Sequence, residues 1–72
     1  MSATEIVAAN IKDIIKASGL KQKAVAEKSG FGDKEFSNLL NGRKRIGAEH
    51  IPAIANALGV TPNDLYKPRE SA

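Results

Sequence analysis

Basic side chains gather in the central third of the chain. Residues 21–45 hold seven lysines and arginines against three acids, a net charge of +4, whereas the other residues hold four against five. Such a cluster often lies on a helix face that simply contacts solvent, but a surface that binds a polyanion also requires a cluster of positive charge. The place of these residues in the fold decides between the two interpretations.

Other kinds of chemistry lack the residues that they require. The chain has no cysteine, and its single histidine, His50, has no paired acids, so the sequence offers no credible metal site. The aromatic residues Phe31, Phe36 and Tyr66 are too few for a platform that stacks single-stranded nucleic acid. Without a cofactor motif or the volume for a buried pocket, an enzyme is a poor interpretation. We expect no cofactor, no metal and no small-molecule ligand.

Length and composition limit the chain to one small globular domain. It has 72 residues, of which 42% are apolar and 26% charged, as is typical of a folded chain. No apolar run is long enough to cross a membrane, and the first residues do not form a signal peptide. We therefore expect a cytoplasmic protein with no membrane partner. Met1 and the polar tail suit a complete small protein, with a truncated N-terminal domain as the alternative.

Apolar residues recur at helical spacing throughout, which predicts an all-α fold. The expected helices cover residues 4–18, 22–29, 33–41, 48–58 and a last turn or two opened by Thr61. We expect Thr4 or Ser2 to cap the first helix, since both side chains can accept a backbone hydrogen bond. Pro52 would disturb a helix that starts at residue 48, so the alternative is a start near residue 51 after an extended or single-turn segment.

The apolar residues of these helices predict one core. Its expected members are Val7, Ile11, Ile14, Ile15, Leu20, Val25, Ala26, Phe36, Leu39, Leu40, Ile46, Ile51, Ile54, Leu58, Val60 and Leu65. Tyr66 is expected to close over this core beside Leu65, as a residue at the edge of the core or as part of a dimer contact. The result is a compact five-helix bundle, with residues 1–66 as a single domain and residues 67–72 as a polar, flexible tail.

The second and third predicted helices have the residues that a helix-turn-helix unit needs. Two helices that cross closely need a small residue at the crossing, and Ala26 stands there. The turn between them needs a positive φ, which Gly30 supplies. Phe36 and Leu39 then provide the large apolar groups that pack back onto the first of the two helices. Together with Gln22, these residues form a fairly specific constellation.

Three segments of the chain carry more specific patterns. Residues 20–30 read LKQKAVAEKSG, residues 39–44 read LLNGRK and residues 54–65 read IANALGVTPNDL. In this order they resemble the LTQxxLAxxxG, LLNGRR (or WExG) and IAKALGVSxxxL motifs of phage-repressor and Cro-like helix-turn-helix domains. The resemblance to this lambda-repressor-like, XRE-type family covers about residues 6–66. It implies a five-helix fold whose third helix enters the major groove of DNA.

The chain departs from the family pattern at three places. Lys21 stands where the family usually has a threonine or serine cap, although lysine can still reach a phosphate. Many members pair an arginine of the first helix with a glutamate that ends the third, whereas the matching positions here are Ile15 and Leu40. Such an apolar pair avoids the desolvation of buried charges. Phe31 and Gly32 are also unusual in the turn.

The resemblance implies two sets of DNA contacts. The outward face of the third helix would read bases, because lysine can donate to guanine and asparagine pairs with adenine. The expected base contacts are Asp33, Lys34, Ser37 and Asn38. The start of the second helix and the end of the third would hold the phosphates. The expected phosphate contacts are Lys21, Gln22, Lys23, Asn41, Arg43, Lys44 and Arg45.

Two hypotheses for the function follow. The first is a sequence-specific, double-stranded DNA-binding transcriptional regulator, a repressor, that acts as a homodimer on a palindromic site. One small module reads only half a site, so a pair of chains is expected. The alternative is a protein-interaction module on the same fold, such as a toxin-masking antitoxin or an adaptor with weak DNA binding. Asp33 and Glu35 favour this alternative, since acids on the expected DNA face repel phosphate.

Overall fold

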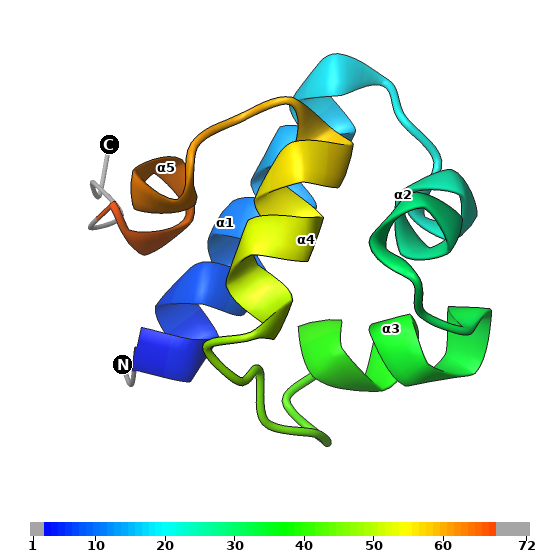
Figure 1. Cartoon of the computed structure of the whole chain (residues 1–72), viewed down its shortest axis with the longest axis horizontal. Helices are drawn as coiled ribbons and strands as arrows, with labels where there is room; N and C mark the ends of the chain where they lie inside the picture. The colour runs from blue at the N-terminus through cyan, green and yellow to red at the C-terminus, as the bar shows by residue number, and fades with distance from the viewer. Residues whose placement is uncertain (1–2, 68–72) are drawn as a thin grey trace.

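Five α-helices make up the part of the chain that the computed structural model describes, residues 3–67 (Figure 1). They are α1 (Ala3–Ser18), α2 (Gln22–Ser29), α3 (Asp33–Leu40), α4 (His50–Leu58) and α5 (Pro62–Tyr66). Helix α4 packs against α2 and α5, α1 packs against α5 and α3, and α2 packs against α3. In the view of Figure 1, α5 lies on one flank and α2 and α3 lie on the other. The expectation of an all-α, five-helix fold is confirmed.

Helix α1 begins earlier than the sequence predicts. Its first described residue is Ala3, so Thr4 lies inside the helix, and the prediction that Thr4 caps it is wrong. The alternative cap, Ser2, lies outside the described residues. The helix ends at Ser18, and Gly19 follows with a φ of +74°. This left-handed conformation turns the chain toward α2.

The helix-turn-helix unit of α2 and α3 is confirmed. Ala26 is fully buried at the crossing, and Gly30 ends α2 with a φ of +84°. The next residue, Phe31, donates its N–H to the carbonyl oxygen of Ala26 (N···O 2.9 Å), which fixes the path of the turn. From α3, Phe36 and Leu39 are completely buried.

The position at which α4 begins explains how the helix accommodates Pro52. The helix begins at His50, so Pro52 is its third residue, and its missing N–H would have no partner within the helix. The residues just before α4 form a turn, in which His50 N–H donates to Gly47 O (3.0 Å) and Ile51 N–H to Ala48 O (3.3 Å). A helix that starts at residue 48 is therefore wrong, and the later start after a single turn is confirmed.

Helix α5 begins at Pro62, after the cap that the sequence predicts. The N–H of Thr61 donates to Oδ2 of Asp64 (3.0 Å), and the Thr61 hydroxyl donates to the same oxygen (3.0 Å). Leu65 is fully buried, whereas Tyr66 is 49% exposed, so Tyr66 lies at the edge of the core and does not close over it. A step of one residue turns a helix by about 100°, which carries Tyr66 away from the side that Leu65 buries.

A side chain of α1 holds the end of α5 in place. Asn10 donates from Nδ2 to the carbonyl oxygens of both Leu65 and Lys67, each at 2.9 Å. Lys67 belongs to the tail that the sequence predicts to be flexible, and residues 68–72 of that tail lie outside the described residues.

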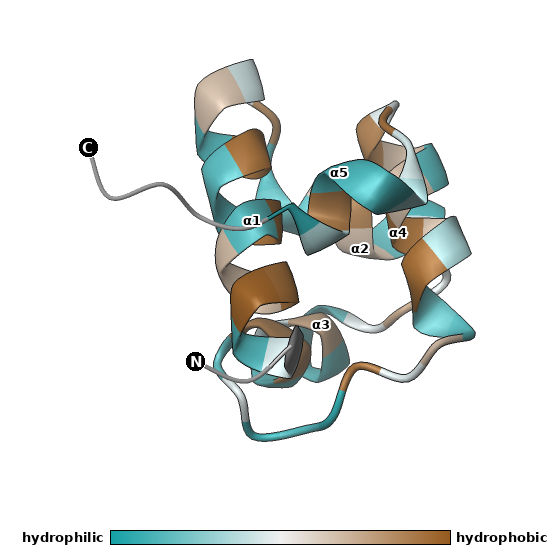
Figure 2. Cartoon of the chain, turned by 90° about the vertical axis from the view of Figure 1, so that its left-hand side faces the viewer, coloured by the Kyte–Doolittle hydropathy of each residue, from teal (hydrophilic) through white to brown (hydrophobic). Residues whose placement is uncertain are grey.

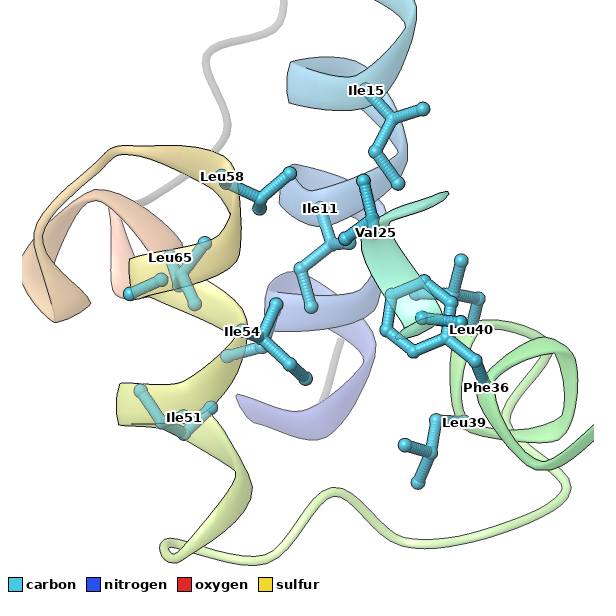
Figure 3. Close-up of a cluster of buried hydrophobic side chains, with 13 residues drawn as sticks. Ile11, Ile15, Val25, Phe36, Leu39, Leu40, Ile51, Ile54, Leu58 and Leu65 are labelled. Carbon is cyan, nitrogen blue, oxygen red and sulfur yellow. The ribbon is translucent and has the colours of Figure 1, made fainter. Parts of the chain in front are cut away.

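One hydrophobic core joins all five helices (Figure 3). Its buried members are Val7, Ile11, Ile15, Val25, Ala26, Phe36, Leu39, Leu40, Ile51, Ile54, Ala55, Leu58 and Leu65. Three expected members, Ile14, Ile46 and Val60, are only partly buried and pack against it. Leu20 was wrongly expected in the core: it is 38% exposed, because it lies in the link between α1 and α2. The expected core list also lacked Ala8 of α1 and Ala55 of α4, which are both buried.

Candidate nucleic-acid interface

The outward face of α3 presents the residues expected to contact bases. Asp33 and Lys34 are exposed in its first turn, whereas Ser37 and Asn38 are half-buried one turn later. The opposite face supplies Phe36, which is fully buried. Because α3 is fixed to the core on one side, its other side forms a polar stripe with a defined direction.

The basic segment after α3 is tied to the end of the helix by backbone hydrogen bonds. The N–H groups of Arg43 and Lys44 both donate to the carbonyl oxygen of Asn38, at 2.9 Å and 3.2 Å. Gly42 allows this tight return with a φ of +76°. The side chains of residues 43–45 are exposed, and the loop after α3 is hydrophilic over most of its length (Figure 2).

Asn41 lies between the polar stripe and the basic segment. It caps the C-terminus of α3, and its N–H donates to the carbonyl oxygen of Ser37 (3.0 Å). Its side-chain amide also donates to the Ser37 hydroxyl (Nδ2···Oγ 3.3 Å), and the Asn41 side chain is exposed. Asn41 therefore caps the helix while its side chain stays accessible to a ligand.

The start of α2 forms a separate polar group. Lys21, Gln22 and Lys23 are exposed, and Lys21 precedes the helix in an extended conformation without a side-chain cap. The first N–H groups of an α-helix have no acceptor within the helix, and they carry partial positive charge. With two lysines beside it, this helix start is suited to a phosphate oxygen.

An ion pair neutralises part of the expected positive charge. Lys44, expected to contact phosphate, is paired with Glu35 of α3, and the two side chains are 48% and 40% exposed. The hydrogen bond from Lys44 lowers the pKa of Glu35 below its usual value. Because both groups remain in contact with water, a phosphate can compete with Glu35 for Lys44.

The aromatic residue in the turn fixes the helix-turn-helix unit to α4. The ring of Phe31 stacks on that of Phe36 (centroids 6.0 Å apart) and meets the imidazole of His50 edge to face (5.1 Å). His50 Nδ1 accepts a hydrogen bond from Gly47 N–H (3.1 Å), and His50 is partly buried. Its ring contact could not be predicted, because Phe31 and His50 are far apart in the chain.

The described residues offer no cluster of metal-binding side chains, and small hollows lie on their surface. Residues 3–67 hold no group of three or more His, Asp or Glu side chains that could bind a metal ion. A groove of about 250 Å³ lies between α1 and the end of α3, and a hollow of about 100 Å³ lies beside Tyr66. No helix in the described part of the chain is long and apolar enough to span a membrane.

Comparison with known proteins finds a matching domain family. A model of the Cro/C1-type HTH DNA-binding domain matches residues 10–70. The uncharacterized HTH-type transcriptional regulator y4dJ of Sinorhizobium fredii is 30% identical over 97% of this chain and 91% of its own length.

Solved structures share the arrangement of the helices. The clp gene regulator ClgR of Corynebacterium glutamicum has a TM-score of 0.83 and 25% identity, over 90% of this chain and 84% of its own. The restriction-modification controller protein C.AhdI of Aeromonas hydrophila has a TM-score of 0.80, over 88% of this chain and 96% of its own. At 22% identity, C.AhdI shows a similar fold only.

Proposed function

This chain belongs to the Cro/C1-type helix-turn-helix DNA-binding domain family. On that premise, we propose that it is a transcriptional repressor that binds specific sequences of double-stranded DNA. Residues 1–66 act as one DNA-binding module. It works by binding rather than by catalysis, and a DNA partner agrees with the cytoplasmic location expected from the sequence.

The observation that carries the proposal is the polar stripe of α3, together with the exposed basic residues at the start of α2 and in the segment after α3. The stripe faces away from the core, because Phe36 and Leu39 bury the other side of the helix. A helix has about the width that the major groove accepts, and residues near its N-terminus then meet the base edges. Lys34 and Asn38 can each pair with a base edge, Ser37 can donate to a base, and Asp33 can accept from cytosine.

Phosphate contacts would hold α3 in the groove. Lys21, Gln22 and Lys23 offer donors at the start of α2, and Asn41 offers its amide at the end of α3. The exposed side chains of residues 43–45 supply the remaining positive charge. Contacts of this kind fix position and orientation without reading the sequence.

We further propose that the protein acts as a homodimer on a palindromic site. A single recognition helix covers a few base pairs, which gives little discrimination among many competing sites. Two copies related by a two-fold axis would present their α3 helices about 34 Å apart to successive turns of the major groove. A module bound at such a site can repress a promoter by occupying it, and this is the regulatory role that we propose.

In vitro selection of duplex DNA with the purified chain tests the function. The expected result is a two-fold symmetric consensus whose binding weakens steeply as salt increases, and Arg43→Ala should reduce the slope of log K against log salt by about 0.9. No enrichment, or binding that salt does not change, would contradict a DNA-binding regulator. That result would instead favour the protein-interaction module, for which the Glu35–Lys44 pair on this face is the supporting observation.

A further inference from the structure

A lysine of the first helix lies beside the expected DNA face. Lys12 donates from Nζ to Oδ1 of Asn41 (3.5 Å), although 29 residues separate the two in sequence. Asn41 in turn donates to Ser37 on the stripe of α3. Lys12 does not belong to the basic cluster at residues 21–45, but the fold brings its charge to the edge of that cluster.

The two side chains together retain donors for an anion. A lysine ammonium has three N–H groups and an asparagine amide has two. One amide N–H of Asn41 is used by Ser37, and one ammonium N–H of Lys12 is used by Asn41. A phosphate oxygen placed against this pair can accept from both residues, and the bond from the ammonium is strengthened by its charge.

A groove next to the pair has the dimensions and lining for a sugar-phosphate segment. Its volume is about 250 Å³, and the residues that line it come from the start of α1 and the end of α3. They are Thr4, Glu5, Ala8, Ala9, Lys12, Leu40, Asn41 and Gly42. The alanines and Leu40 offer an apolar wall for a deoxyribose. A glycine at 42 leaves room for the backbone of a ligand, since a Cβ there would have no neighbour within 4 Å.

We propose that Lys12 and Asn41 jointly bind one phosphate of duplex DNA, with the adjoining sugar over the groove between α1 and α3. This inference rests on the proposed DNA-binding function, and it extends the contact surface from the helix-turn-helix unit to α1. The occupant is the DNA backbone, because the groove is continuous with the predicted interface at Asn41 and carries the positive charge of Lys12 at its edge. Glu5 lines the groove as well, so the phosphate would lie at the Lys12–Asn41 end.

Lys12→Gln and Lys16→Gln provide a matched pair of variants. Both remove one exposed positive charge from α1, but Lys16 lies one turn further along and does not line the groove. Binding is measured over a series of salt concentrations, with the selected duplex and with an unrelated duplex. Lys12→Gln should weaken binding by the same factor on both duplexes and lower the salt slope by about 0.9, whereas Lys16→Gln should leave the slope unchanged.

A double-mutant cycle tests whether the phosphate is shared. If Lys12 and Asn41 bind the same phosphate, then Lys12→Gln combined with Asn41→Ala should cost less affinity than the two single losses predict. Circular dichroism and thermal melting show whether each variant is folded, and Lys12→Arg should keep the slope. Equal slopes for the Lys12 and Lys16 variants, or additive losses, overturn the shared site while the wild-type chain still binds DNA. Failure of the wild-type chain to bind any duplex overturns the proposed function itself.

Discussion

Glu35 on α3 forms an ion pair with Lys44 in the segment that follows this helix. The pair joins an acid on the expected DNA face to Lys44, which is one of the residues expected to contact a DNA phosphate. Because both side chains are partly exposed, the pair contributes little to stability, and its main effect is on the charge available to a ligand.

Replacing Glu35 should therefore strengthen DNA binding. Glu35→Gln removes a charge that repels phosphate and releases Lys44, so affinity for duplex DNA should rise at low salt and the gain should diminish as salt increases. Glu27→Gln, at an exposed acid of α2, is the control for loss of a carboxylate away from this face. Fluorescence anisotropy with labelled duplex measures both. An equal gain from the two variants would indicate an effect of net charge alone.

Asp64 should make the stability of α5 depend on pH in the acid range. The hydrogen bond from Lys67, followed by the bonds from Thr61, lowers the pKa of Asp64 from 3.8 to about 2. A carboxyl group with a lower pKa in the folded state stabilises the fold above its unfolded pKa, and this contribution is lost as pH falls through the folded pKa. Asp64→Asn should thus lower the Tm at pH 7, and the difference should shrink between about pH 4 and pH 2.

The pKa of Asp64 can be measured directly by NMR titration of its carboxyl carbon. The Glu27→Gln variant serves again as a control, here for loss of a carboxylate outside α5. A midpoint near 3.8, or a Tm difference for Asp64→Asn that stays constant down to pH 2, would show that the contacts with Lys67 and Thr61 do not persist in solution.

Ala26 should tolerate no larger side chain. It is completely buried where α2 crosses α3, so Ala26→Leu forces extra atoms into a packed contact and should destabilise the fold by about 1–3 kcal/mol. Ala24→Leu on the same helix is exposed, and its effect should stay within about 0.5 kcal/mol. Urea denaturation gives both free energies of unfolding. Similar values for the two variants would contradict the close crossing of α2 and α3.

The contact between Phe31 and His50 should couple the turn to α4. Phe31→Ala should cost about 1–3 kcal/mol of stability, less than for a fully buried ring, because Phe31 is only partly buried. A double-mutant cycle with His50→Ala should give a coupling energy of about 0.5–1.5 kcal/mol, the range for aromatic pairs. Additive losses would mean that the two rings do not interact.

Features governed by local chemistry could be predicted from the sequence. The helix ends at Gly30 and Gly59 follow from the left-handed conformation that glycine adopts, and the start of α5 follows from the Thr61–Pro62 pair. The buried face of α3 follows from the spacing of its apolar residues. Each of these features depends on only a few neighbouring residues, so the rest of the fold does not change where the helix begins or ends or which face it buries.

Features governed by contacts between distant segments could not be predicted in the same way. Leu20 is apolar but lies in a link, and nothing in its neighbours shows that the link passes over the surface. The pairing of Lys44 with Glu35 and the approach of Lys12 to Asn41 depend on how α1, α3 and the basic segment are placed in space. The base and phosphate contacts themselves stay predictions until a complex with DNA is measured.

The hydrogen bonds at the carbonyl oxygen of Asn38 have a consequence for how binding specificity can change. Arg43 and Lys44 are anchored there through the main chain, which every amino acid provides alike. A substitution at position 38 can therefore replace a base contact without moving the segment that would hold the DNA backbone. Residues 34, 37 and 38 can therefore be varied together to change which bases are read. A library confined to these positions should yield variants that bind new DNA sequences, with the same dependence of log K on log salt as the wild-type chain.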